Sequence, residues 1–301
     1  MQNPISRRAV RVRIGEQDAL RVGLARYNWR DPYYVVLTLR WPAFFAGVFA
    51  FYGLANFLFA IVYWLDPTSV AGVHPDGRFL DDFFFSIETL ATVGYGKLTP
   101  SDLYGHGISS LEIVFGLILA AMITGLVFAR FSRPKARLLF SEVAVVAPYE
   151  CKTALMARVV SERNQAIADA TSRMMVLRES RTPEGHVMRR FTDLTLVRAY
   201  SPIVALSWTL IHVIDEASPL WGKTAEDLKS EDVRIFISIG GYDEGISARI
   251  LDRKTYNADR IRYGHTFEDI MSDSPDGTII LDMTRFHNTR EMPRGAVAEG
   301  A

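Results

Sequence analysis

Residues 92–96 read TVGYG, and their backbone could coordinate a dehydrated cation. Successive carbonyl oxygens can replace the water shell of K⁺, with the Thr92 hydroxyl at the inner end. The carbonyls point the same way only if alternate residues adopt left-handed backbone angles, which glycine tolerates without a Cβ clash. One chain supplies a quarter of such a ring, so the motif predicts a homotetramer. The proposed K⁺ ligands are the carbonyls of Thr92, Val93, Gly94 and Tyr95, and Gly96 closes the segment.

TVGYG is the loop sequence of known potassium-channel selectivity filters, so its chemistry is recognised and not deduced. The same five residues could also form a strand and a glycine-rich turn in a soluble protein. The flanking sequence decides between the two interpretations.

Two long apolar segments flank the motif. Trp41–Leu65 contains 25 residues and no charge. As a helix it would be roughly 37 Å long, enough to cross a bilayer core of about 30 Å. The second segment, residues 108–128, holds one ionisable residue, Glu112, and is rich in Gly, Ala and Ile, which suit close helix packing. Two segments of this length argue against a soluble protein with two core helices.

Basic residues are concentrated outside the spans. Eight arginines precede the first span, and Arg130, Arg133, Lys135 and Arg137 follow the second. The intervening loop has only Arg78 and Lys97, beside five aspartates. This bias places both termini in the cytoplasm. The polar, basic N-terminus argues against a cleaved signal peptide, so we expect a multi-pass protein of the cell inner (plasma) membrane.

Residues 80–91 are expected to form a short re-entrant pore helix, whose negative C-terminal end would favour a cation at the pore centre. Glu88 should lie behind the filter, and an intramembrane carboxylate is a functional hypothesis by default. We expect it to brace the filter rather than to bind ions. Two arrangements stay open: an ion pair with Lys97, or a protonated carboxyl bonded to filter amides.

Several motifs resemble the inward-rectifier potassium channels, specifically the prokaryotic (KirBac-type) branch. WRDPYY at 29–34 and Trp41-Pro42 resemble the interfacial slide helix and span entry of that family. LVFARFSRP at 126–134 resembles its inner-helix exit, and DLTLVR at 193–198 and HVIDEASPL at 212–220 resemble its cytoplasmic domain. Lys97 departs from the aspartate common after the filter. The similarity covers nearly the whole chain.

This resemblance implies roles on the inner helix. One stripe at helical spacing matches the pore-lining positions of the family, although such a stripe can also be helix packing. Its members are Ile113, Leu117, Ala120, Thr124 and Phe128. Ala120 stands where strongly rectifying members carry a carboxylate, and Phe128 stands at the hydrophobic gate. Gly116 and Gly125 are either bending points or sites of close helix approach.

A second inference concerns the membrane surface. Asp31 is a good N-cap and Pro32 a good first helical residue, so the slide helix should begin there. An apolar stripe of Tyr33, Val36, Leu37 and Trp41 predicts that it lies in the membrane surface, and the alternative is an ordinary cytoplasmic end of the first span. The proposed anionic-lipid ligands are Arg30, Arg130, Arg133, Lys135 and Arg137. The alternative is that these charges set topology only. The resemblance implies that acidic lipids modulate gating.

From residue 138 onward the pattern becomes alternating. Six runs predict strands: 143–148, 153–161, 167–178, 186–198, 234–240 and 248–254. A short helix is expected from Thr224, with Asp227 completing a capping box. These elements indicate an all-β sandwich, which the resemblance makes immunoglobulin-like. The domains are therefore 1–40 (N-terminus with slide helix), 41–131 (pore) and 132–301 (cytoplasmic sandwich).

Composition adds limits. The chain has 34 basic and 34 acidic residues, one cysteine (Cys151) and six histidines without metal-ligand spacing. We expect no enzyme activity, no cofactor beyond K⁺ in the filter, and no nucleic-acid partner. The predicted function is a K⁺-selective channel gated from the cytoplasmic side. A less selective cation channel would require an altered filter, and a membrane-tethered sensor would require a catalytic constellation.

Overall fold

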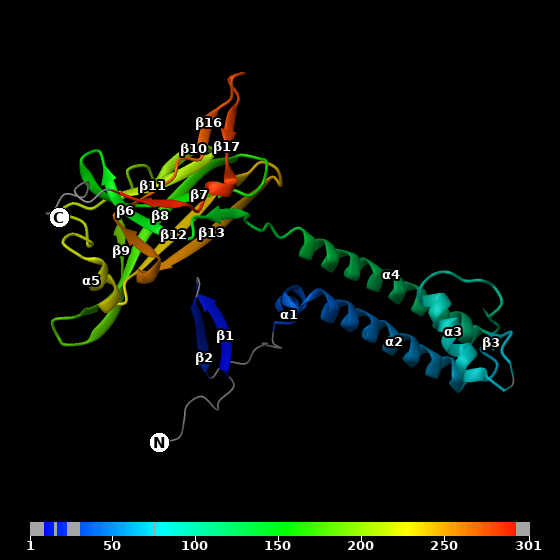
Figure 1. Cartoon of the computed structure of the whole chain (residues 1–301). Coiled ribbons are helices and arrows are strands. Elements are labelled where there is room, and N and C mark those ends of the chain that lie inside the picture. Colours follow the sequence, from blue (N-terminus) through cyan, green and yellow to red (C-terminus); the bar gives the residue numbers. More distant parts are fainter. Residues whose placement is uncertain (1–8, 15–16, 23–30, 75, 293–301) are drawn as a thin grey trace. The chain divides into compact units, whose positions relative to one another are not determined.

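The computed structural model describes residues 9–14, 17–22, 31–74 and 76–292, and it divides into two compact units (Figure 1). One unit is Ala25–Arg133, which contains the TVGYG segment. The other combines Met1–Leu24 with Pro134–Ala301.

The first unit is helical. It contains α1 (Pro32–Thr38), α2 (Trp41–Leu65), α3 (Arg78–Leu90) and α4 (Leu103–Phe131). Two-residue strands β3 (Val70–Ala71) and β4 (Thr99–Pro100) pair in the loops on either side of α3. Helices α2 and α4 are long and apolar enough to cross a membrane. The bounds of α2 are those predicted, whereas α4 begins five residues before the predicted span, because the Asp102 carboxylate caps its first turn at Gly105 N.

The slide helix starts as predicted. Asp31 Oδ1 accepts a hydrogen bond from Tyr34 N at 3.0 Å, and Pro32 occupies the first turn. Val35 and Leu37 are buried, while Tyr33 and Tyr34 are exposed. The helix ends at Thr38, and an extended Arg40 leads directly into α2.

The second unit is a two-sheet sandwich. One sheet has the order β10-β8-β12-β13, with β9 also paired to β8. The other has the order β11-β7-β6-β14, with β5 also paired to β7. The first sheet comprises β8 (Ile167–Arg181), β9 (Val187–Leu194), β10 (Tyr200–Val204), β12 (Arg234–Asp243) and β13 (Ala248–Asn257). The second comprises β5 (Leu138–Phe140), β6 (Ala144–Tyr149), β7 (Lys152–Ser161), β11 (Ser207–Val213) and β14 (Ile261–Tyr263). Only β14 and β6 pair in parallel among these strands of the described chain.

Alternate residues of both sheets meet in one core. Along β12, Ile235, Ile237 and Ile239 are buried, and along β11 Trp208 and Leu210 face them from the other sheet. Each such side chain contributes roughly 1.5–3 kcal/mol by burial. All six predicted strands are confirmed, with β9 ending earlier than expected.

The remaining elements are short. Helix α5 (Ala225–Ser230) has the predicted capping box of Thr224 and Asp227. Three small antiparallel pairs were not predicted: β1 (Ala9–Ile14) with β2 (Gln17–Val22), β15 (His265–Phe267) with β18 (Thr289–Glu291), and β16 (Met271–Asp273) with β17 (Ile279–Leu281). Single turns of 3₁₀ helix occur at Ala258–Arg260 and Met283–Arg285.

Candidate ion-conduction site

The TVGYG segment follows the C-terminal end of α3, and backbone hydrogen bonds to the last turn of that helix hold its first residues. Thr92 N donates to Thr89 O at 3.0 Å, and Val93 N donates to Glu88 O at 2.8 Å. Gly94 N lies 3.3 Å from the same Glu88 carbonyl. The last turn of the pore helix therefore holds the first amides of the segment, and α3 occupies the place predicted for the re-entrant helix.

The backbone of this segment alternates. Thr92, Gly94 and Gly96 have φ values of +56°, +55° and +82°. The left-handed glycines were expected, but Thr92 was not, and an L-residue there costs roughly 1–2 kcal/mol. A Cβ at Gly94 would meet nothing within 4 Å in the single chain, so its constraint is the backbone angle and not lack of space.

Glu88 and Lys97 are not paired within one chain. One carboxylate oxygen of Glu88 is buried without a hydrogen-bond partner, and Lys97 is exposed. Among the described residues no ion pair joins them. The hydrogen bonds that hold the segment use the Glu88 backbone carbonyl, so a brace through its carboxyl stays a prediction.

Helix α4 has one face buried against its own unit and another left open. The buried residues are Gly105, Ser109, Glu112, Gly116 and Leu119. The five predicted pore-lining residues all belong to the open surface: Ile113, Leu117, Ala120, Thr124 and Phe128. Phe128, at 72% exposure, is more exposed than the other two large side chains, Ile113 and Leu117. The stripe is therefore free to line a shared pore.

The two candidate glycines differ. A Cβ on Gly116 would lie 2.3 Å from the carbonyl oxygen of Leu90, at the end of α3. Gly116 is thus a site of close helix approach. Gly125 has nothing within 4 Å of an added Cβ, so the bending hypothesis stays open only there.

A buried polar cluster that joins the three long helices of this unit was not predicted. Glu112 is fully buried, with Oε2 accepting from Tyr63 Oη at 2.7 Å and Oε1 at 2.5 Å from Ser86 Oγ. These three residues come from α4, α2 and α3. The sequence offered one clue, because Glu112 is the single ionisable residue of its apolar segment.

The proposed lipid ligands divide into different environments. The Arg130 guanidinium donates to Val36 O and, at 2.6 Å, to Leu39 O, and it lies 4.4 Å from the Trp41 ring centroid. Arg137 pairs with Glu162 at 3.7 Å. Of the other proposed lipid ligands, Arg133 and Lys135 are exposed, and Arg30 lies outside the described residues.

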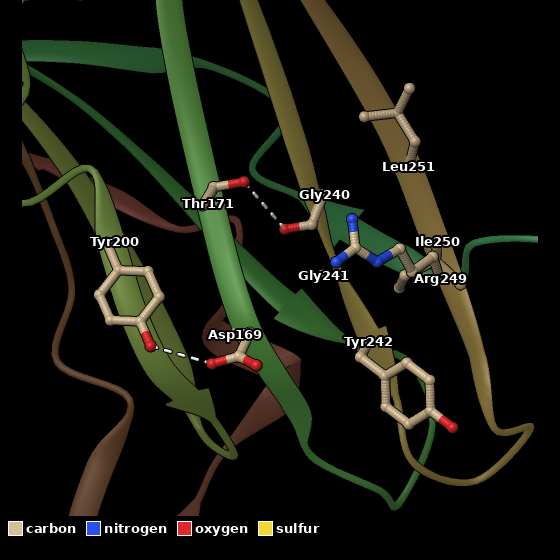
Figure 2. Close-up of a pocket in the computed structure, with 9 residues that line it drawn as sticks. All are labelled: Asp169, Thr171, Tyr200, Gly240, Gly241, Tyr242, Arg249, Ile250 and Leu251. Carbon is tan, nitrogen blue, oxygen red and sulfur yellow. Dashed lines mark hydrogen bonds between the residues drawn. The ribbon is translucent and has the colours of Figure 1, made fainter.

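The sandwich carries a separate surface cavity of about 690 Å³ (Figure 2). Its charged lining residues are Asp169 and Arg249. Tyr200 Oη donates to Asp169 Oδ1 at 2.9 Å, and this hydrogen bond raises the pKa of Tyr200. Figure 2 shows the Thr171 hydroxyl directed at the Gly240 carbonyl instead of into the cavity. The lining offers neither a nucleophile–base pair nor a metal-ligand cluster.

Two family models match the chain. The C-terminal domain of inward rectifier potassium channels matches residues 138–300, and an ion channel model matches residues 53–133. The inward rectifier potassium channel Kirbac3.1 of Paramagnetospirillum magnetotacticum is 37% identical over 274 residues, covering 91% of this chain and 92% of the relative. The chain belongs to the inward rectifier potassium channel family.

More distant members are also similar. Human inward rectifier potassium channel 18 is 30% identical, covering 87% of this chain and 65% of the relative. Mouse G protein-activated inward rectifier potassium channel 3 is 28% identical, covering 95% of this chain and 80% of the relative. The predicted family, its membrane setting and its two-span plus β-sandwich fold are confirmed. This is a family of ion channels and not of enzymes.

Proposed function

We propose that four copies of this chain form a K⁺-selective pore across the cell inner membrane. The observation that carries the proposal is the alternating backbone at Thr92, Gly94 and Gly96, directly after a helix whose Glu88 carbonyl holds the next amides. Alternation lets successive carbonyl oxygens share one direction. Four such segments would supply the rings of oxygen dipoles that replace the hydration shell of K⁺.

The other parts of the pore follow from α3 and α4. The C-terminal end of α3 meets the filter, where its negative dipole end favours a cation. The open stripe of α4 supplies the cavity wall, in which Ala120 brings no charge. The four Phe128 side chains form an apolar ring at the cytoplasmic exit, which can stop ions by dewetting.

Orientation and lipid control belong to the same proposal. The excess of arginine outside the two spans supports cytoplasmic termini. Arg133 and Lys135 are exposed just after α4, where clustered basic residues attract acidic head groups at about 1 kcal/mol each. Arg130 is already engaged by backbone carbonyls, so it is a weaker lipid ligand than its sequence position suggests.

Cation flux into liposomes tests the proposal. Purified protein should take up Rb⁺ against a K⁺ gradient, with block by Ba²⁺ and little uptake of Na⁺. Equal Na⁺ and K⁺ flux would favour the less selective cation channel. Absence of flux from well-assembled protein in any lipid mixture would favour a tethered sensor.

A further inference from the structure

The buried cluster at Glu112 joins all three helices behind the filter. Tyr63 of α2 donates to Glu112 Oε2, and Ser86 of α3 contacts Oε1. Ser86 Oγ also lies 3.1 Å from Asn56 Oδ1, and Asn56 Nδ2 donates to Tyr52 O at 2.7 Å. Glu112, Ser86 and Asn56 are each fully buried. The chain of contacts therefore runs unbroken from α4 through α3 to the backbone of α2.

The donors and acceptors of this hydrogen-bonded cluster show whether Glu112 is protonated. The amide of Asn56 must direct its nitrogen at the Tyr52 carbonyl, because two facing oxygens would repel, so its oxygen faces Ser86. The Ser86 hydroxyl has one proton and two acceptor sites. An ionised Glu112 would take that proton and leave the Asn56 oxygen without a donor. A protonated Glu112 donates to Ser86, which then donates to Asn56, and each contact in the chain has one proton.

Charge balance favours the same state. A buried carboxylate needs a cation or several donors to offset desolvation. Among the described residues Glu112 forms no ion pair. The cation of this region, Arg78, already lies 3.6 Å from the buried Asp82 carboxylate and donates to the carbonyls of Tyr63 and Asp66. Ionised Glu112 would add a second buried negative charge without adding a counter-ion.

The cluster also fixes the filter. Glu112 and Gly116 are one turn apart on α4, and they contact Ser86 and Leu90, one turn apart on α3. The same end of α3 presents the Glu88 carbonyl to the filter amides. Rotation or withdrawal of α3 from α4 would therefore move that carbonyl.

We propose that Glu112 carries a proton and is the positioning residue that locks the pore helix between the two spans. It donates a hydrogen bond to Ser86 and accepts one from Tyr63. The position of the pore helix therefore depends on neutral hydrogen bonds and not on an ion pair. This role rests on the proposed K⁺ conduction, whereas the proton itself does not.

Conservative and non-conservative variants separate the two states of Glu112. Glu112→Gln places an amide nitrogen at Ser86 and an amide oxygen at Tyr63, so Rb⁺ uptake and K⁺ over Na⁺ preference should match wild type. Glu112→Leu and Ser86→Ala should each lower Rb⁺ uptake per assembled tetramer, or its K⁺ preference, about tenfold, as expected for stranded buried polar groups. Ser110→Ala is the matched control, because within the described part of the chain that exposed hydroxyl bonds only to its own helix, at His106 O.

Infrared difference spectroscopy of wild type against Glu112→Gln measures the proton directly. At neutral pH we expect wild type to show a carboxylic-acid C=O band from Glu112 that the Gln variant lacks. This measurement does not require the Leu and Ala variants to assemble. A carboxylate band in its place, or a Gln variant as impaired as the Leu variant, would overturn the proposal. Wild-type protein without K⁺ flux would instead refute conduction and leave the infrared result to decide the proton.

Discussion

Gly116→Ala tests the close approach of α4 to the C-terminal end of the pore helix. The added methyl group would lie 2.3 Å from Leu90 O and 3.1 Å from Leu90 C. Ordinary contact needs at least 3.4 Å, so α4 must withdraw by about 1 Å or the end of α3 must shift. Either movement displaces Leu90 relative to α4, and Leu90 lies two residues before Thr92.

The magnitude follows from two opposing effects. Overpacking a close contact costs about 1–3 kcal/mol, whereas replacing glycine by alanine in a helix gains about 1 kcal/mol. The net loss is therefore about 0–2 kcal/mol per subunit. Gly125→Ala is the matched control on the same helix, since its methyl group meets nothing within 4 Å and only the gain remains.

Heat resistance of the proposed tetramer and Rb⁺ uptake together provide the assay. Gly116→Ala should dissociate at lower temperature than wild type and conduct less, while Gly125→Ala should be at least as heat-resistant. Wild-type stability and flux in Gly116→Ala would refute the close approach of α4 to Leu90. Reduced flux of a stable Gly125→Ala tetramer would identify Gly125 as the bending point.

Four further substitutions probe the proposed filter, the membrane surface and the cavity. Gly94→Ala should abolish Rb⁺ uptake in an intact tetramer, because φ of +55° costs an L-residue about 1–2 kcal/mol; normal uptake would exclude the filter. Arg130→Ala should alter flux in neutral and acidic liposomes alike, whereas Arg133→Ala should change only the dependence on acidic lipid; identical responses would refute this division. Ala120→Asp should create voltage-dependent block by internal spermine, since charges attract strongly in a confined low-dielectric cavity. A current–voltage curve like that of wild type would show that position 120 does not face the pore.

The sequence predicted those elements that depend on local pattern. Helix α2 was predicted to the residue because no charge interrupts it and Arg40 and Asp66 flank it. Six of the ten sandwich strands followed from alternation, whereas β5, β10, β11 and β14 were not predicted. The N-terminal turns of α4 do not show in the sequence pattern because Gly105 and Gly107 are poor helix formers, and the helix starts there because Asp102 caps it. Strands β14 to β18 have three residues each, too few for a period to show.

The site was predictable as a motif but not as a set of contacts. TVGYG predicts the filter, yet the left-handed Thr92 depends on how α3 ends. Arg130 was assigned to lipid because basic residues after a span commonly serve that role. Its actual partners, the carbonyls of Val36 and Leu39, depend on how α1 packs against α4, which no local pattern encodes.

Helix α3 illustrates why such contacts matter in a membrane. Lipid tails are as apolar as the helices, so burial alone provides little force to hold one helix against another. The pore helix is instead held by a polar chain at Glu112, by backbone approach at Gly116, and by the edge-on contact of Phe85 with Tyr63, whose ring centroids are 5.0 Å apart. Substitutions in α4 should therefore cost stability according to their contact with α3 and not according to their hydrophobicity. Exposed positions such as Leu111, at 66%, should accept other apolar residues, while a single added methyl group at Gly116 should cost up to about 2 kcal/mol.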